Sequence, residues 1–219
     1  MTATAKGAEN VNWWVEPAWA QRYLRERENI PHRAEGVGVL VELLPPGPLR
    51  VLDLGTGDGY LMGVVRSERS GVTGIACDFS DEMLDHARAR FAATDDVEVV
   101  RHDLDEPLPD AWGTFDVVTS SFAIHHVVDE RKRSLYGEVF EHLVPGGVFF
   151  NLEHVASPSP ELHLEFLDAI GKTTETDDPS NKLAPVEAQL EWLREGGYEH
   201  VDCHWKWREL ALLSGRRPR

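Results

Sequence analysis

The segment 51–60, which reads VLDLGTGDGY, constrains the fold of this chain more than any other stretch. A short apolar run leads into a loop that has glycine at every second position, at Gly55, Gly57 and Gly59. Because glycine lacks a Cβ, such a loop can adopt positive φ angles and let a ligand approach the backbone amides. Tyr60 stands where the G-x-G-x-x-G loop of dinucleotide-binding domains has its third glycine, which counts against a nicotinamide-dependent oxidoreductase.

The rest of the chain alternates strand-like and helix-like segments, which predicts an α/β fold with a parallel sheet and right-handed crossovers. The predicted strands are residues 50–54, 72–77, 97–100, 115–119 and 148–152. In such sheets, ligands bind beyond the carboxyl ends of the strands. Polar side chains stand at those ends, namely Asp53, Asp78, Asp103, Ser120, His125 and Glu153. Two later strand-like segments, 198–205 and 207–214, are too close together for a crossover and therefore predict an antiparallel hairpin.

The composition limits the partners that this chain can have. Its formal net charge is −16, and such an acidic surface repels nucleic-acid phosphates and anionic lipid. No apolar run approaches the length of about 18 residues that a membrane span needs, and the first residues lack the apolar core of a signal peptide. Cys77 and Cys203 lie far apart in the sequence. We therefore expect a cytoplasmic protein, a monomer or homodimer, with no nucleic-acid or membrane partner.

Two segments stand apart from this alternation. Residues 1–32 include Trp13, Trp14 and Tyr23, and they form either a helix packed on the domain edge or a helical lid over a substrate pocket; the two interpretations are compatible. Residues 33–219 are predicted to form the main domain. Within it, the stretch at about 155–184 is longer than an ordinary connection, so we predict that it is a cap insertion.

Several segments together resemble the class I S-adenosylmethionine (SAM)-dependent methyltransferases of the small-molecule type. They are VLDLGTGDGY at 51–60, ACDFS at 76–80, HDL at 102–104, FDVV at 115–118 and LVPGG at 143–147. The segments DPSN at 178–181 and LALLSGRR at 210–217 resemble small-molecule members in particular. The resemblance implies a Rossmann-like, mostly parallel sheet of seven strands in the order 3-2-1-4-5-7-6, with strand 7 antiparallel and helices on both faces.

The resemblance also implies SAM as the cofactor, S-adenosylhomocysteine (SAH) as its product and a small organic acceptor. The glycine loop suits the methionine end of SAM, Asp78 suits the two ribose hydroxyls, and Asp103 suits the adenine amine. Phe79 and Met83 can enclose the adenine ring, while Asp53 either suits the ligand's ammonium or orients the loop. The predicted cofactor-binding residues are Asp53, Gly55, Thr56, Gly57, Asp78, Phe79, Met83, Asp103, Leu104 and Ser120.

Methyl transfer to a hydroxyl or an acidic carbon needs a base, and His125 and His126 follow strand 4, beside the expected sulfonium. Adjacent helical residues cannot both face one pocket, so we predict at most one base and favour His126. The alternative is a loop histidine that only binds the backbone. Glu153 and His154, after strand 5, are the next candidates, with Glu153 as a residue that orients a histidine or an acceptor amine. The predicted substrate-binding residues are Trp13, Trp14, Tyr23, His154, Asp178 and Asn181.

These candidate histidines and acids do not have the tight spacing of metal ligands, so we predict no metal. The sequence therefore predicts a SAM-dependent methyltransferase that transfers a methyl group to a small organic acceptor at O, N or C. The alternative is a protein of the same fold that binds SAM or SAH for non-methylating chemistry or as a sensor, because a fold does not determine an activity.

Overall fold

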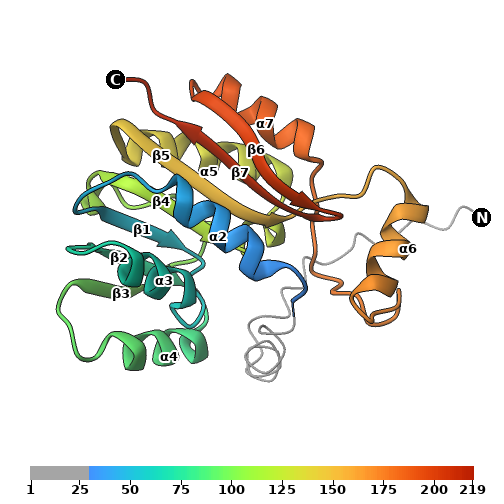
Figure 1. The fold of residues 1–219 in the computed structure, drawn as a ribbon, viewed down its shortest axis with the longest axis horizontal. Coiled ribbons are helices and arrows are strands. Elements are labelled where there is room, and N and C mark those ends of the chain that lie inside the picture. Colours follow the sequence, from blue (N-terminus) through green and yellow to red (C-terminus); the bar gives the residue numbers. More distant parts are fainter. Residues whose placement is uncertain (1–29) are drawn as a thin grey trace, which may run out of the picture.

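The computed structural model describes residues 30–219, and these have the predicted α/β architecture (Figure 1). Seven strands form one sheet in the order β3-β2-β1-β4-β5-β7-β6. Strands β1 to β5 are parallel to one another, whereas β7 runs antiparallel to both β5 and β6. The predicted strand order and the terminal hairpin are confirmed. The strands are β1 Arg50–Leu54, β2 Thr73–Asp78, β3 Val97–Arg101, β4 Phe115–Ser121, β5 Leu143–His154, β6 Glu199–Trp207 and β7 Leu210–Arg216.

Helices cover both faces of the sheet, and two hydrophobic clusters hold them there. Successive strand residues point to opposite faces, so Val51 of β1 packs with the helices on one face and Leu52 packs with those on the other. The first cluster includes residues of α2, α3 and α4, and the second includes residues of α5 and α7. These helices are α2 Arg33–Leu43, α3 Tyr60–Glu68, α4 Asp81–Phe91, α5 Asp129–His142 and α7 Val186–Glu195, with short 3-10 helices at η3 Asp110–Trp112 and η4 Ile124–His126.

The start of β5 differs from the prediction. The sequence predicts a turn at 144–147 followed by a strand from Val148, but the strand begins at Leu143. Leu143 pairs with Phe115 and Val148 pairs with Val117, so the register between the two strands changes across the intervening residues. Pro145, Gly146 and Gly147 therefore lie in a bulge within a paired strand. Turn-forming residues alone do not distinguish such a bulge from a loop.

Residues 155–184, which we call the cap, leave the sheet at the end of β5 and return to it before α7. The cap carries α6 (Pro160–Ala169), which projects beyond the end of the sheet (Figure 1). The Ala156 amide donates to the Ala184 carbonyl at 3.0 Å, so the two ends of the cap lie side by side. Its role as a separate insertion stays a prediction. Of the predicted arm at 1–32, only residues 30–32 are among the described residues. Trp13, Trp14 and Tyr23 lie outside them.

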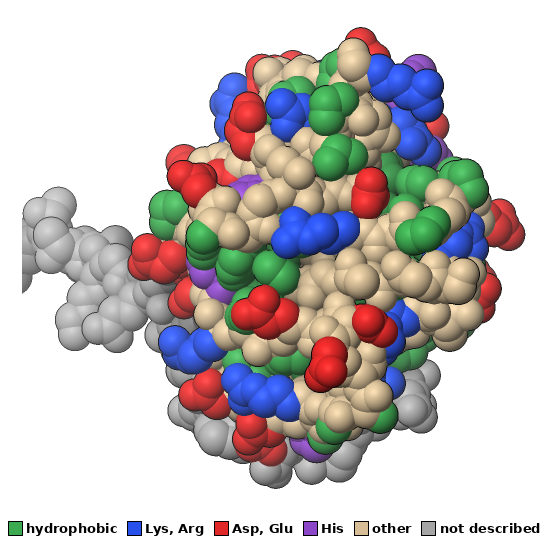
Figure 2. Space-filling view, turned by 90° about the vertical axis from the view of Figure 1, so that its left-hand side faces the viewer, with side chains coloured by type: hydrophobic (Ala, Val, Ile, Leu, Met, Phe, Trp, Pro, Cys, Tyr) green, Lys and Arg blue, Asp and Glu red, His purple; other side chains and the backbone are tan. Residues whose placement is uncertain are grey.

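The described surface carries both signs of charge. Figure 2 shows acidic and basic side chains interspersed over the face that it presents. None of the helices within residues 30–219 has the length and hydrophobicity needed to cross a bilayer.

Candidate active site

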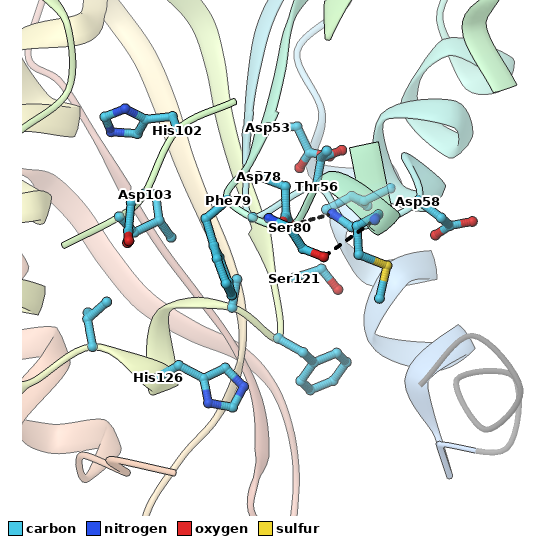
Figure 3. Close-up of a pocket in the computed structure, with 18 of the residues that line it drawn as sticks. Asp53, Thr56, Asp58, Asp78, Phe79, Ser80, His102, Asp103, Ser121 and His126 are labelled. Atoms are coloured by element: carbon cyan, nitrogen blue, oxygen red, sulfur yellow. Dashed lines mark hydrogen bonds between the residues drawn. The ribbon is translucent and has the colours of Figure 1, made fainter. Parts of the chain in front are cut away.

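A pocket opens at the carboxyl ends of β1, β2 and β4, where the sequence predicts the cofactor (Figure 3). Every predicted cofactor-binding residue lines it except Ser120. Ser120 is buried in the sheet and Ser121 lines the pocket instead, because successive residues of β4 face opposite sides. The lining residues are Arg33, Asp53, Gly55, Thr56, Gly57, Asp58, Leu61, Asp78, Phe79, Ser80, Met83, His102, Asp103, Leu104, Asp105, Ser121, Phe122, Ala123, His126 and Val127.

The glycine loop forms one wall of this pocket. Gly55 and Gly57 have φ angles of +62° and +58°, a region that disfavours residues with side chains. A Cβ on Gly55 would lie 2.2 Å from the Cβ of Ala123, so the segment after β4 approaches this backbone too closely for any side chain. A Cβ on Gly57 would meet nothing within 4 Å. The loop is therefore packed at Gly55 and open at Gly57, where a ligand can lie directly against the backbone.

Asp78 holds this loop from the end of β2. Its Oδ2 accepts a hydrogen bond from the Gly57 amide and its Oδ1 accepts one from the Ser80 amide, each at 2.9 Å (Figure 3). Burial raises the pKa of the Asp78 carboxyl, and the two amides oppose that rise. Each carboxylate oxygen has more than one lone pair. Both oxygens can therefore accept a further donor from a ligand in the pocket, such as the two hydroxyls of a ribose.

Asp53 lies beneath the loop and is fully buried. It accepts hydrogen bonds from the hydroxyls of Thr56 at 2.5 Å and Thr119 at 2.7 Å. Burial raises the pKa of Asp53 to about 6, although these hydroxyls oppose the rise. The contact with Thr56 supports the predicted role of Asp53 in orienting the loop. Its contact with the ammonium of a ligand stays a prediction.

The chemistry of the pocket fits the parts of SAM. Phe79 and Met83 provide apolar walls beside the Asp103 carboxylate, as an adenine ring with an exocyclic amine requires. The Asp78 carboxylate faces the same pocket and suits the ribose. The Arg33 guanidinium lies 4.6 Å from the centre of the Tyr60 ring and brings a positive charge suited to the carboxylate of SAM.

Sequence reasoning missed several of these lining residues. Arg33 comes from α2, ahead of the first strand, and its Nη2 lies 3.4 Å from the Ser121 hydroxyl, 88 residues away in the sequence. Phe122 has a φ of +54°, a conformation that is uncommon for a bulky residue and that no motif signals. Of these three residues, only His102 could have been predicted from the sequence, because it immediately precedes Asp103 in the HDL segment.

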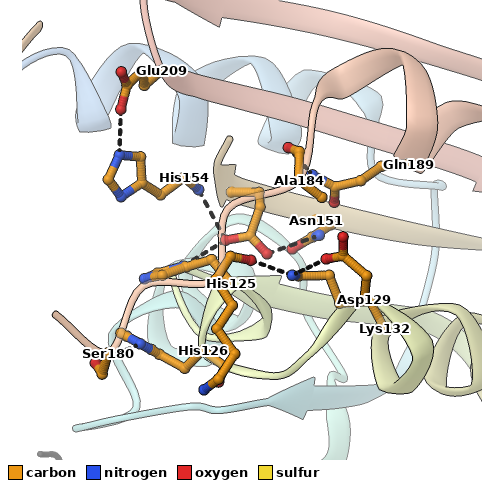
Figure 4. Close-up of polar contacts among 12 residues, drawn as sticks. His125, His126, Asp129, Lys132, Asn151, His154, Ser180, Ala184, Gln189 and Glu209 are labelled. Atoms are coloured by element: carbon orange, nitrogen blue, oxygen red, sulfur yellow. Dashed lines mark hydrogen bonds and ion pairs between the residues drawn. The ribbon is translucent and has the colours of Figure 1, made fainter. Parts of the chain in front are cut away.

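His126, the favoured base, lines the pocket at the end of η4. Its Nδ1 lies 3.1 Å from the hydroxyl of Ser180, a residue of the cap (Figure 4). Burial lowers the pKa of His126 well below 6.5, and the neighbouring His125 lowers it further. The imidazole is therefore neutral at pH 7, which is the form that can accept a proton.

His125 lies behind His126, outside the pocket lining, with the two ring centres 4.0 Å apart. Its Nδ1 lies 2.7 Å from Oε1 of Glu153, which is fully buried (Figure 4). Burial raises the pKa of Glu153 to about 7 and lowers that of His125 well below 6.5. Glu153 thus contacts a histidine, and the catalytic roles of both residues stay predictions.

The described part of the chain also places His154, Asp178 and Asn181 outside the pocket lining. The Nε2 of His154 lies 2.9 Å from Oε2 of Glu209. Asp178 accepts a hydrogen bond at 2.6 Å from the Ser180 hydroxyl, which also contacts His126. Their contact with substrate stays a prediction. Among residues 30–219, no group of three or more His, Cys, Asp or Glu side chains is arranged to hold a metal ion.

Comparison with known proteins identifies the domain. Residues 51–147 match the family described as a methyltransferase domain. Over 111 residues, the chain is 38% identical to the demethylmenaquinone methyltransferase of Clavibacter sepedonicus, an alignment that covers 51% of this chain and 43% of that protein. Residues 51–147 therefore belong to the class I SAM-dependent methyltransferase family. The predicted family, with SAM as its cofactor, is confirmed.

Two further similarities extend over more of the chain. The ubiquinone/menaquinone biosynthesis C-methyltransferase UbiE of Cereibacter sphaeroides is 27% identical over 192 residues, which are 79% of this chain and 74% of that protein. A chain from the complex between the Haloferax volcanii Trm112 methyltransferase activator and a methyltransferase shares the fold, with a TM-score of 0.70 and 21% identity; 95% of this chain and 99% of that chain are covered. By contrast, the chain spans about half the length or less of the demethylmenaquinone methyltransferases that it matches.

Proposed function

We propose that this methyltransferase acts on a small organic acceptor whose reacting oxygen or carbon carries an acidic proton. The observation that carries the proposal is the neutral imidazole of His126 at the pocket wall, on the segment that follows β4. A base of this kind is needed for a hydroxyl or an acidic carbon and adds nothing for an acceptor that is already nucleophilic. The similarity to a C-methyltransferase of ubiquinone and menaquinone biosynthesis also supports this acceptor class.

Methyl transfer is a displacement at carbon, so most of the catalysis is positioning. SAM, when bound, supplies an electrophilic methyl group on a sulfonium sulfur. The glycine loop and Asp78 would hold the cofactor, and Arg33 would pair with its carboxylate. His126 would take the proton of the acceptor as the acceptor attacks the methyl group, and the sulfur would leave with the C–S electron pair as the neutral thioether of SAH. The proton then passes from the imidazole to solvent.

We also propose that the reaction takes place in the cytoplasm. The enzyme would be a monomer or homodimer without a nucleic-acid or membrane partner. The net charge of −16 supports the absence of an anionic polymer as substrate. Both cysteines, Cys77 and Cys203, are free thiols, which fits a reducing compartment.

An assay with methyl-labelled SAM tests the acceptor class. Phenols and hydroquinones form one set of acceptors, primary amines a second and RNA a third, with SAH release measured in parallel. We expect label in the first set, in amounts equal to the SAH formed. Label confined to amines or RNA would contradict the proposal, and saturable SAM binding without transfer to any set would favour a sensor.

A further inference from the structure

The cap reaches the catalytic histidine through two residues of the DPSN segment. The Ser180 hydroxyl lies 3.1 Å from Nδ1 of His126 and donates its proton to Oδ1 of Asp178 at 2.6 Å. The same Oδ1 accepts the Ser180 amide at 2.8 Å, so the serine is held at both its backbone and its side chain. Ser180 is only 3% exposed, which keeps water from replacing these contacts.

The directions of these hydrogen bonds follow from the groups involved. An ionised carboxylate only accepts, and a serine hydroxyl has one proton to donate. Because that proton goes to Asp178, the Ser180 oxygen is left as an acceptor towards His126. The contact at Nδ1 therefore requires Nδ1 to carry the proton of the neutral ring. Nε2 is then the nitrogen that has a lone pair and can accept a proton.

The backbone around His126 is clamped by the same part of the cap. Lys182 donates from Nζ to the His126 carbonyl at 2.5 Å, and its amide donates to the His125 carbonyl at 2.8 Å. The buried Lys132 of α5 donates in turn to the Lys182 carbonyl and to Asp129 (Figure 4). The cap thus fixes both the backbone and the ring of the histidine.

We propose that Ser180 and Asp178 are positioning residues that hold His126 in its Nδ1–H tautomer, so that the base is competent only when the cap is seated against it. This inference rests on the proposed function of His126 as the base. It gives the cap a role in positioning the base. A methyltransferase that lacked the contact would keep its cofactor site, because none of the described residues that line the pocket belongs to the cap.

The charged groups that face His126 set the direction of its pH response. The imidazole of His125 and the ammonium of Lys182 lower the pKa of His126, whereas the carboxylate of Asp178 and a hydrogen bond with the Ser180 backbone raise it. Asp103 and Asp78 lie on the other walls of the pocket. Replacing Asp178 with a neutral residue therefore moves the pKa of His126 further down, and the acid limb of the activity profile should move to lower pH with it.

The tautomer can be measured directly, without any turnover. In protein labelled with ¹⁵N-histidine, long-range proton–nitrogen spectra distinguish a protonated ring nitrogen from an unprotonated one. We expect His126 of the wild type to show a protonated Nδ1, with and without SAH. Ser180→Ala should mix the two tautomers, and Ser180→Thr should restore the wild-type spectrum. A wild-type His126 protonated at Nε2 would overturn the inference.

Turnover gives the second arm of the test. Losing one ordinary hydrogen bond corresponds to a threefold to tenfold change, so Ser180→Ala should lower kcat by about that factor for a phenol assayed below the phenol's own pKa. The affinity for SAM and the KM for the phenol should stay at wild-type values. With the phenol already ionised at higher pH, Ser180→Ala should match the wild type. Thr174→Ala removes an exposed hydroxyl from the same cap and serves as the control.

The outcomes separate the two proposals. An unchanged kcat and an unchanged tautomer in Ser180→Ala, with the acid limb of Asp178→Asn unmoved, would refute the positioning role while leaving the methyltransferase intact. Absence of transfer by the wild type would refute the proposed function, and the tautomer measurement would still decide whether the cap holds the ring. A loss of kcat that persists with the ionised phenol would show a general disturbance of the site and would also refute positioning.

Discussion

Replacing Asp78 should weaken SAM binding more than any other single change in the cofactor site. The carboxylate faces the pocket, and each of its oxygens already holds a backbone amide at 2.9 Å, so its position is fixed before the ligand arrives. Hydrogen bonds to a charged group contribute about 1.5–3 kcal/mol each. Loss of two such bonds to the ribose in Asp78→Ala should cost at least about 3 kcal/mol, which is about a hundredfold in Kd.

The effect should be measured by isothermal titration with SAM and with SAH. Asp78→Asn keeps the shape of the side chain but turns an amide NH₂ towards one of the two backbone N–H groups, so we expect a loss of about tenfold or more. Asp81→Asn is a matched control, because Asp81 stands in the first turn of the next helix and is exposed. A Kd for Asp78→Ala within twofold of the wild-type value, in a protein that remains folded, would refute the ribose assignment.

Three further changes test other parts of the account. His126→Ala should lower kcat by about 10²–10⁴-fold and leave the Kd for SAM unchanged. Because burial keeps the pKa of His126 well below 6.5, turnover of the wild type should fall only at a pH well below 6.5. Burial raises the pKa of Asp53 from 3.8 to about 6, so its ionisation costs stability as pH rises through that range. Urea unfolding from pH 4 to pH 7 should therefore show Asp53→Asn gaining up to about 3 kcal/mol relative to wild type. Glu209 accepts hydrogen bonds from His154, Ser157 and His163 and so helps to hold the cap in place. Glu209→Gln should therefore raise the KM for the acceptor and speed proteolysis within the cap. A cap that resists limited proteolysis as well as the wild type does would contradict this role of Glu209.

The parallel part of the sheet was predictable because its strands contain short apolar runs followed by a polar residue. The predicted range for β1 coincides with the one observed, since the glycine loop marks where the strand ends. Asp53, Asp78 and Asp103 then gathered in one pocket because parallel strands end at the same edge. Local sequence carried all of this information.

What could not be predicted depends on register and on distant contacts. The strand-4 hydroxyl in the pocket is Ser121 rather than Ser120, because a shift of one residue along a strand exchanges its two faces. Arg33 enters the pocket from a helix that carries no motif. The contact between Ser180 and His126 joins residues 54 positions apart, and neither the spacing nor the residue types indicate it.

A crystal structure with SAH bound tests the central claim most directly. We predict that both ribose hydroxyls lie within hydrogen-bonding distance of Asp78, that the adenine lies between Phe79 and Met83 beside Asp103, and that the sulfur faces the side of the pocket on which His126 lies. The account would be contradicted by SAH bound away from the glycine loop, or by a sulfur turned away from His126 with other side chains beside it.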